Sequence, residues 1–435
     1  AAIEPTWDDV LPVAPVGSGA LGRARFALTQ ALLGQGFGAP ARLRGWVRRC
    51  VLERRRREHG AAATLRWALK APVRVVRDAR AAVRLRGAAC AAAYGVSPRA
   101  QLAQIVWLGL AHGLEPESYY RYWLHRPERR RLGGHWMQKP DAALLYRLLA
   151  ARVAREDFAI LEDKGRFAAW CAEHALPHPA AVAEFRDGAL AWPEPSALRL
   201  PASDLFSKLT DGYGGYGAGV WRHRGAERWE GDDGAVYDRE ALLAALAARS
   251  RESGLLLQPR LGNDPALRPI APSALGTLRV MTGRREGAEP EVLVAVFRTG
   301  AGGSTSDNYS TGGMVAAMEL STGRLRSAVR ADRLLLNVLV EAHPDTGTPF
   351  AGFAIPRWRE ALDLARRAHA RLRSIPVVGW DIAFTPDGLV LLEGNFNPGV
   401  ILVQAGDAGA LGATPYMRLL DETLHRAFAR AARRR

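Results

Sequence analysis

One stretch near the C-terminal end, GWDIAFTPDGLVLLEGNFNPG at residues 379–399, restricts the fold more than any other part of the sequence. Two runs of strand-forming residues, VVGWDIAF and LVLLEGN, are separated there by the tripeptide Pro-Asp-Gly at 386–388. Proline followed two positions later by glycine is typical of a three-residue hairpin loop. The pattern therefore predicts an antiparallel β-hairpin in which Thr385 lies opposite Leu389.

The register of that hairpin brings three polar side chains together. If Thr385 is opposite Leu389, then Asp381 is opposite Glu393, and Asn395 shares the face of Glu393 because residues two apart on a strand point the same way. Two adjacent carboxylates repel each other unless a cation lies between them, and ligation by oxygen alone suits Mg²⁺. We therefore expect a magnesium site here rather than a polar sheet surface in solvent. The residues expected to face the core are Ile382, Val390 and Leu392.

A second informative stretch is SKLTDGYGGYGAGV, at residues 207–220. Gly212, Gly214 and Gly217 formally match the G-x-G-x-x-G pattern of dinucleotide-binding folds, but a strand-like VWRH follows where that fold needs a helix. The lysine precedes the glycines, unlike in a Walker A loop, and no protein-kinase signature accompanies them. Two strands around a glycine loop, with Lys208 just before it, favour a flap that closes over phosphates. The alternative is an ordinary glycine-rich hairpin.

Lysine is rare in this chain. Four of its 60 basic residues are lysines, namely Lys70, Lys139, Lys164 and Lys208. A lysine that remains in so arginine-rich a sequence can mark a place where a compact ammonium contacts a phosphate oxygen and a planar guanidinium would not fit. We apply this interpretation to Lys164 and Lys208, and regard Lys70 and Lys139 as incidental.

The positive charge is concentrated in the N-terminal third. Residues 1–150 hold 25 Lys and Arg against 10 Asp and Glu, so they carry nearly all of the net charge of +16. They are rich in Ala, Leu and Arg, which predicts a helical region over residues 1–155. Segment 41–60 interleaves apolar residues with eight arginines, which indicates either a solvated helix face or a basic surface for an anionic substrate or a membrane. Nucleic acid is a less favoured partner because no nucleic-acid-binding module accompanies the charge.

The chain after residue 155 mixes strand-like and helical runs, which predicts an α+β domain over residues 156–435. Residues 161–185 are expected to form a helix and then, after a proline-marked entry, a strand. Further helices are expected at 358–374 and 414–435. Strands are expected at 204–209, 217–223, 254–261, 275–282, 291–300, 314–320, 377–384 and 389–396. The three cysteines, Cys50, Cys90 and Cys171, form no C-x-x-C pair, so we expect free thiols in a cytoplasmic protein.

The order of these motifs resembles the ATP-grasp superfamily, and within it the sugar-transfer associated ATP-grasp group. The motifs are LEDKGRF, FSKLTDGYGGYG, LLLQPRL, TLRVMT, FRTG with DNYSTGG, and GWD with EGNFNPG. The most specific element is the aspartate, with a glutamate twelve residues later and an asparagine two beyond. The resemblance implies two α+β subdomains that hold ATP between them. The basic helical region stands where many relatives have a Rossmann-like domain.

The resemblance also implies roles for individual residues. Lys164 and Lys208 would contact the α- and β-phosphates of ATP, and the magnesium ligands would hold two Mg²⁺. Arg298, Arg279 and Asn308 would face the γ-phosphate and the acyl-phosphate. The remaining nucleotide-binding residues would be Gly212, Gly214, Gly215 and Gly217 in the closing loop, and Gln258, Arg260 and Leu261 against adenine.

The activity that the resemblance implies is that of an ATP-dependent carboxylate–amine ligase. Such an enzyme activates a small-molecule carboxylate as an acyl-phosphate and then joins it to an amine, with release of ADP and phosphate. The basic N-terminal third favours a sugar acid or another anionic small molecule as the acid. Two alternatives stay open, a phosphotransferase on the same fold and a non-catalytic nucleotide-binding scaffold.

Overall fold

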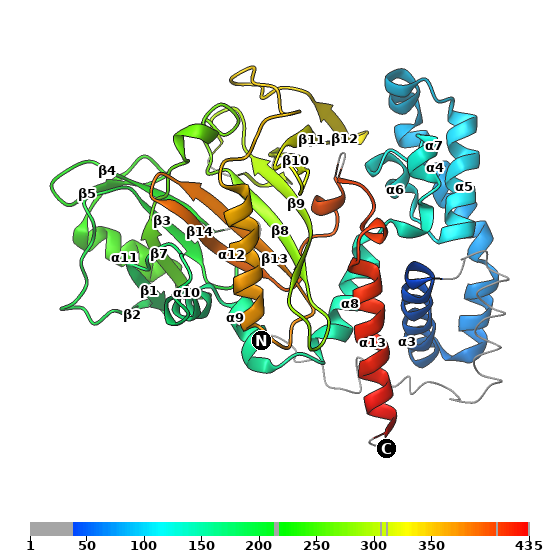
Figure 1. Cartoon of the computed structure of the whole chain (residues 1–435), viewed down its shortest axis with the longest axis horizontal. Coiled ribbons are helices and arrows are strands. Elements are labelled where there is room, and N and C mark those ends of the chain that lie inside the picture. Colours follow the sequence, from blue (N-terminus) through cyan, green and yellow to red (C-terminus); the bar gives the residue numbers. More distant parts are fainter. Residues whose placement is uncertain (1–37, 213–216, 305–306, 310–311, 406–407, 434–435) are drawn as a thin grey trace.

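The computed structural model of the protein describes residues 38–212, 217–304, 307–309, 312–405 and 408–433, with the side chains of the last helix described as far as Arg426. Two seven-stranded sheets lie next to each other, and a helical part extends to one side of them (Figure 1). The α+β organisation expected from the sequence is therefore confirmed. Within the described ranges, no helix is both long and apolar enough to cross a membrane.

Helices make up the N-terminal part, as expected for the described residues before 155. Each of these helices has proline in its first turn, where the missing N–H costs no intrahelical hydrogen bond. The second and third end at Gly95 and Gly113, which adopt the left-handed conformation that glycine allows. The bounds are α3 (Ala39–Leu69), α4 (Ala71–Tyr94), α5 (Pro98–His112), α6 (Pro116–Arg121), α7 (Pro127–Arg130), the 3₁₀ turn η1 (Gly133–His135) and α8 (Lys139–Ala150).

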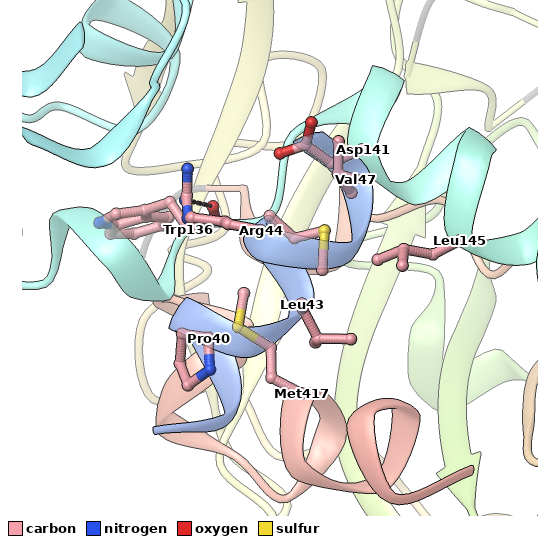
Figure 2. Close-up of a pocket in the computed structure, with 9 residues that line it drawn as sticks. Pro40, Leu43, Arg44, Val47, Trp136, Asp141, Leu145 and Met417 are labelled. Carbon is pink, nitrogen blue, oxygen red and sulfur yellow. Dashed lines mark hydrogen bonds between the residues drawn. The ribbon is translucent and has the colours of Figure 1, made fainter. Parts of the chain in front are cut away.

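The first half of α3 is anchored by Arg44, whose buried guanidinium donates to the backbone carbonyls of His112 and Trp136, the latter at 2.8 Å. Burial lowers the pKa of Arg44 to about 10, although nearby Asp141 favours the charged form. Figure 2 shows Arg44 beside a cavity of about 10 Å³ that is lined by α3, α8 and the C-terminal helix. A space of that size holds roughly one water molecule. We therefore interpret it as a gap between packed helices rather than as a ligand site.

The first sheet has the strand order β2-β1-β7-β3-β4-β5-β6. Leu242 and Leu246 of helix α11 pack onto it and form a core of their own with its strands. Two further helices, α9 (Arg155–Glu162) and α10 (Lys164–Glu173), precede this sheet in the chain. The bounds are β1 (Ala183–Arg186), β2 (Ala189–Trp192), β3 (Leu205–Leu209), β4 (Gly219–His223), β5 (Arg228–Glu230), β6 (Val236–Asp238), α11 (Arg239–Arg249) and β7 (Leu255–Pro259).

The second sheet has the order β12-β11-β10-β9-β8-β13-β14. Helix α12 packs on this sheet, and the largest core joins the two to α8 and the C-terminal helix α13 (Figure 1). The bounds are β8 (Thr277–Gly283), β9 (Glu291–Thr299), β10 (Met314–Met318), β11 (Leu325–Asp332), β12 (Leu336–Val340), α12 (Trp358–Arg371), β13 (Val377–Thr385), β14 (Gly388–Asn395) and α13 (Tyr416–Arg433), with the short 3₁₀ turns η2 (Pro265–Leu267), η4 (Leu402–Gln404) and η6 (Leu411–Ala413).

All the expected strands and helices of this domain are present, including α10 and β1 within residues 161–185. The strands β2, β5, β6, β11 and β12 and the helix α11 were not predicted. Three of these strands have only three or four residues, and β11 and β12 are partly exposed and carry charged or polar residues. Such segments give too weak an apolar alternation to be recognised from sequence.

The turn of the C-terminal hairpin differs from the expected one. Thr385 pairs with Gly388 and not with Leu389, so the loop contains two residues, 386 and 387, where three were predicted. The Thr385 hydroxyl donates to the Gly388 carbonyl at 2.9 Å, which closes this tighter turn. Because a register changed by one residue reverses the faces of a strand, the tighter turn alone would have separated the two carboxylates.

A β-bulge restores the predicted pairing of the carboxylates. Ile382 pairs with Leu391, the next residue Leu392 is unpaired, and Asp381 then pairs with Glu393. The extra residue compensates for the short loop, so the expected pair is correct although the turn that was used to derive it is wrong.

The core-facing residues of β14 change accordingly. Leu389 and Leu391 are buried, whereas Val390 and Leu392, which were expected in the core, are only half-buried. Ile382 on the partner strand is buried as predicted. The prediction failed for β14 because it assigned the faces from the three-residue loop.

Candidate functional site

Two lysines from the first half of the fold meet the edge of the second sheet. Lys164 begins α10, and its Nζ lies 3.8 Å from Oε2 of Glu393 on β14. Lys208 lies on β3, and its Nζ is 3.5 Å from the carbonyl oxygen of Leu392 in the bulge. The backbone N–H of Lys164 donates to Thr210 at the end of β3, which holds the two lysines next to each other. Cationic groups of one subdomain thus face carboxylates of the other.

Burial strongly affects Lys208. Desolvation lowers its pKa from 10.5 to about 8; Glu393 and Asp381 oppose the decrease, and Lys164 adds to it by repulsion. An ammonium in such a place gains from any additional negative charge that arrives beside it. Phosphate oxygens are groups that would supply this charge.

Arg279 and Arg298 enclose the carboxylate of Asp381. Arg279 on β8 pairs directly with Asp381 on β13 and forms a two-point salt bridge with it, with Nη2 2.8 Å from Oδ2. Arg298 on β9 donates to the same Oδ2 at 3.1 Å. Although burial opposes ionisation, the two guanidinium groups hold the pKa of Asp381 well below its usual range. Both arginines predicted to be catalytic therefore lie at the predicted magnesium ligand.

Asp307 is a member of this cluster that was not predicted. Its Oδ1 accepts a hydrogen bond of 2.6 Å from Arg298, and its Oδ2 accepts one from the Thr277 hydroxyl. Arg298 thus bridges Asp307 and Asp381. The pKa of Arg298 is raised far above its usual value, since the attraction of these carboxylates outweighs burial. The position of Asp307 beside Asn308, which was predicted, is the signal that could have identified it.

Glu393 and Asn395 complete the predicted metal set. The Asn395 side chain donates to Glu393 at 3.2 Å and to the Gly379 carbonyl at 3.3 Å. Within the described residues, no group of three or more His, Cys, Asp or Glu side chains is placed to hold a metal ion. Mg²⁺ is usually held by one or two carboxylates together with substrate phosphates, so two carboxylates and one amide are a suitable donor set. The residues fit a magnesium ion that arrives with a nucleotide.

The glycine loop is described only at its two ends. The carbonyl of Gly212 accepts a hydrogen bond from Nζ of Lys164. Gly217 has a φ of 72°, and a side chain there would collide with Leu209 at 2.6 Å. Gly214 and Gly215 lie outside the described residues. One described end of the loop therefore contacts Lys164, and the other packs against Leu209, the residue after Lys208.

The predicted adenine contacts lie along β7 and just after it. Gln258 is buried and donates to the carbonyl of Pro179 at 3.0 Å. The N–H of Arg260 donates to the carbonyl of Asp204, and its guanidinium pairs with the same aspartate at 3.1 Å. Leu261 is half-buried. The contacts of Gln258 and Arg260 are thus already made within the protein.

The loop that contains Asn308 is joined to the helical part of the molecule. The backbone carbonyl of Asn308 accepts from the N–H of Gly313 at 3.0 Å, which closes the loop. The hydroxyl of the next residue, Tyr309, donates to the side chain of Asn337 on β12, which is fully buried. Asn337 in turn donates to the carbonyl of Arg121 at 2.6 Å. This chain of contacts was not visible in the sequence, because Asn337 lies in a strand that was not predicted.

Residues 147–415, well over half of the chain, match the protein family described as sugar-transfer associated ATP-grasp. This match confirms the resemblance inferred from the motifs and the ATP-grasp fold expected from it. No curated protein matches the chain by sequence.

Several solved structures are distantly similar. D-alanyl-alanine synthetase A from Vibrio cholerae is 13% identical with a TM-score of 0.35, over 64% of this chain and 68% of that one. L-amino acid ligase from Bacillus licheniformis is 12% identical with a TM-score of 0.34, over 61% and 49%. N5-carboxyaminoimidazole ribonucleotide synthetase from Thermus thermophilus is 16% identical with a TM-score of 0.29, over 69% and 63%. The chain spans only about half to two thirds of their lengths, and similarity this low assigns no activity.

Proposed function

This chain belongs to the sugar-transfer associated ATP-grasp family, and from this membership we propose that it is an ATP-dependent carboxylate–amine ligase. The observation that carries the proposal is the meeting of Lys164 and Lys208 with Glu393 and Asp381 between the two subdomains. Cations placed opposite carboxylates suit a polyphosphate that arrives with a divalent metal.

In this proposal the two lysines bind the nucleotide phosphates. Lys208, whose pKa is lowered by burial, regains a favourable electrostatic environment when a phosphate binds beside it. Lys164 would exchange its contact with the Gly212 carbonyl for a phosphate oxygen, which links nucleotide binding to the glycine loop. Adenine would lie along the segment after β7, next to Leu261.

Magnesium would be held by Asp381, Glu393 and Asn395 together with the phosphates, and it would neutralise charge on the group being transferred. Of the arginine contacts of Asp381, Oδ1 accepts one, from Arg279, whereas Oδ2 accepts from both arginines. Oδ1 therefore retains capacity to accept a further ligand.

Arg298 is the residue that we propose to face the transferring phosphoryl group. The substrate carboxylate oxygen forms a bond to the γ-phosphorus, and the bond from that phosphorus to the β–γ bridging oxygen breaks, so ADP leaves with the electron pair. The guanidinium balances the negative charge on the equatorial oxygens, which is the main requirement in phosphoryl transfer. Arg279 acts behind it by holding Asp381 in place.

The second step forms the amide. The amine nitrogen attacks the acyl carbon of the acyl-phosphate, the bond from that carbon to the phosphate oxygen breaks, and the amine proton passes to solvent. The protein needs no side-chain nucleophile for this chemistry, because positioning and charge neutralisation supply the catalysis. The acid is proposed to be a sugar acid or another small anion, in keeping with the basic N-terminal third.

The acyl-phosphate can be tested for by trapping with hydroxylamine. The purified protein is incubated with Mg·ATP, a panel of sugar acids and amino acids, and hydroxylamine, and both ADP and the hydroxamate are measured. A ligase gives ADP and hydroxamate in equal amounts with one class of acid. ADP with a stable phosphorylated product and no hydroxamate indicates the phosphotransferase alternative. Nucleotide binding without ADP release under every condition indicates the scaffold.

A further inference from the structure

The helices farthest from the first sheet expose an unusual number of apolar side chains. In the described residues, eight of the thirteen exposed large apolar side chains lie between Val51 and Leu110. Leu65, Leu69, Val73 and Leu85 are 61–72% exposed, whereas the exposed apolar side chains elsewhere reach at most 56%. Single exposed leucines need no explanation, but a concentration on three consecutive helices, with the most exposed side chains on α3 and α4, indicates a surface with a partner.

The same helices are strongly basic. Residues 61–110 contain eight Lys or Arg and a single acid, Asp78, which pairs with its neighbour Arg77 at 2.9 Å. A shallow groove of about 420 Å³ runs along α4, and Pro72, Val73, Val76, Arg77, Arg80 and Arg84 line it. Apolar and cationic side chains thus share one side of α4.

The spacing of these residues places them in one stripe. Leu65, Leu69, Val73, Arg77, Arg80 and Arg84, which we call the α3–α4 face, follow one another at intervals of three or four residues. The two helices share Lys70, whose N–H donates to the Arg66 carbonyl at the end of α3 and whose carbonyl accepts from Arg74 at the start of α4. The stripe is therefore continuous from the end of α3 onto α4.

Two features hold the α3–α4 face away from the two sheets and α13. Gly60, with a φ of 80°, interrupts α3, so its second half leaves the direction of the first half, which packs on α13. Trp67 lies between the guanidinium groups of Arg55 and Arg74, at 4.7 Å and 4.1 Å, which fixes the junction of the two helices. Figure 1 shows α4 and α5 at the end of the molecule opposite to the first sheet.

We propose that the α3–α4 face docks onto the surface of a membrane that contains anionic lipids. The exposed leucines and Val73 would enter the boundary between headgroups and acyl chains, while the arginines would contact lipid phosphates. Both kinds of side chain gain from a bilayer. A nucleic acid would use the arginines but not the leucines, because base stacking needs aromatic side chains at these positions. The proposal goes beyond the ligase activity and does not depend on it.

The test is co-sedimentation of the full chain with vesicles. Phosphatidylcholine vesicles are compared with vesicles in which about a third of the lipid is phosphatidylglycerol, at low and at high salt. We expect binding to the anionic vesicles that decreases with salt. Replacing Arg77, Arg80 and Arg84 by Gln should weaken it by on the order of 100-fold, since each basic residue near such a surface contributes about fivefold. Replacing Leu65, Leu69 and Val73 by Ser should weaken it by roughly tenfold or more.

Matched variants test whether vesicle binding depends on where the substituted side chains lie, or only on the loss of three apolar or three basic residues. Trp192, Val236 and Leu339 are 45–56% exposed on the two sheets, and their replacement by Ser should leave vesicle binding unchanged. Arg359, Arg366 and Arg367 are exposed on α12 and provide the corresponding charge control. All substituted residues are exposed and distant from the lysine–carboxylate cluster, so unfolding midpoints should match that of wild type.

Three outcomes would overturn the proposal. The first is absence of binding to anionic vesicles at low salt. The second is an arginine-dependent interaction that the serine variant retains in full and that duplex DNA or heparin reproduces, which would show a general polyanion surface. The third is an equal loss in the matched sheet and α12 variants, which would show that the α3–α4 face has no special role.

Discussion

The carboxylate of Asp381 is held by the guanidinium of Arg279 through two parallel contacts across the neighbouring strands β8 and β13. Both residues are buried, with exposed fractions of 4% and 7%. A buried ion pair stabilises little compared with apolar residues of the same size, but the loss of one partner leaves an isolated charge. The pair is therefore a sensitive place at which to test the arrangement of the site.

The Asp381–Arg279 pair predicts strong coupling in a double-mutant cycle. Asp381→Leu leaves two buried guanidinium groups near each other and should cost about 3–5 kcal/mol of unfolding free energy, and Arg279→Met should cost a similar amount. The double variant should cost less than the sum by at least about 1 kcal/mol. Urea unfolding at neutral pH measures all three. Additive losses would mean that the two side chains do not depend on each other.

The lowered pKa of Lys208 predicts a dependence of stability on pH. Its folded pKa of about 8 lies below the ordinary value of 10.5, so between these values the unfolded chain binds more protons than the folded one. Stability contributed by Lys208 should therefore rise as pH increases from about 8 to 10.5. The unfolding free energy of the nucleotide-free wild type, minus that of Lys208→Met, measures this. Lys139→Met, at an exposed lysine of α8, is the control. A difference that stays constant with pH would contradict the burial of this ammonium.

The shape of Lys208 should matter as well as its charge. In Lys208→Arg the charge remains, but the larger, planar guanidinium would not keep the ammonium's position beside the Leu392 carbonyl, from which we propose that it contacts the phosphates. Because a hydrogen bond to a charged group contributes about 1.5–3 kcal/mol, we expect roughly 10- to 100-fold weaker binding of Mg·ATP. Isothermal titration calorimetry measures the affinity directly. Unchanged affinity would remove the reason for treating the rare lysines as phosphate ligands.

The contact between Tyr309 and Asn337 predicts that the helical part supports the loop beside Arg298. Asn337→Ala leaves the Tyr309 hydroxyl and the Arg121 carbonyl without this partner, which should cost about 1–3 kcal/mol of stability. Tyr309→Phe removes only the hydroxyl and should cost less. In both variants ADP release should fall while the affinity for Mg·ATP is kept, since neither residue touches the lysines. Full activity in Asn337→Ala would show that the loop is positioned by other contacts.

The sequence alone was sufficient to predict the strands and helices that have a clear apolar pattern. The hairpin that carries Asp381 and Glu393 was predicted because both strands are nearly continuous apolar runs and the turn has distinctive residues. The short loop and the bulge at Leu392 could not be predicted, because each changes the register by one residue and composition does not distinguish them.

Contacts between residues far apart in the chain could not be predicted from local sequence patterns. That Arg279 and Arg298 both reach Asp381 depends on the order β9-β8-β13, which joins strands far apart in the chain. The resemblance to a family placed these residues at one site. Asp307 begins the DNYSTGG motif but was assigned no role, and Asn337 lies in no motif. Their roles follow from tertiary packing, which a single sequence does not encode in any local pattern.

Thermal unfolding with and without Mg·ATP, on wild type and on Glu393→Gln, tests the central claim most directly. A nucleotide that binds only the folded protein must raise the midpoint. We predict a magnesium-dependent rise in wild type and a much smaller rise in Glu393→Gln, because the variant loses a ligand charge beside Lys164. Glu240→Gln, on the exposed surface of α11, should behave as wild type. An equal rise in all three proteins would contradict the metal site, and no rise at saturating nucleotide would contradict ATP binding itself.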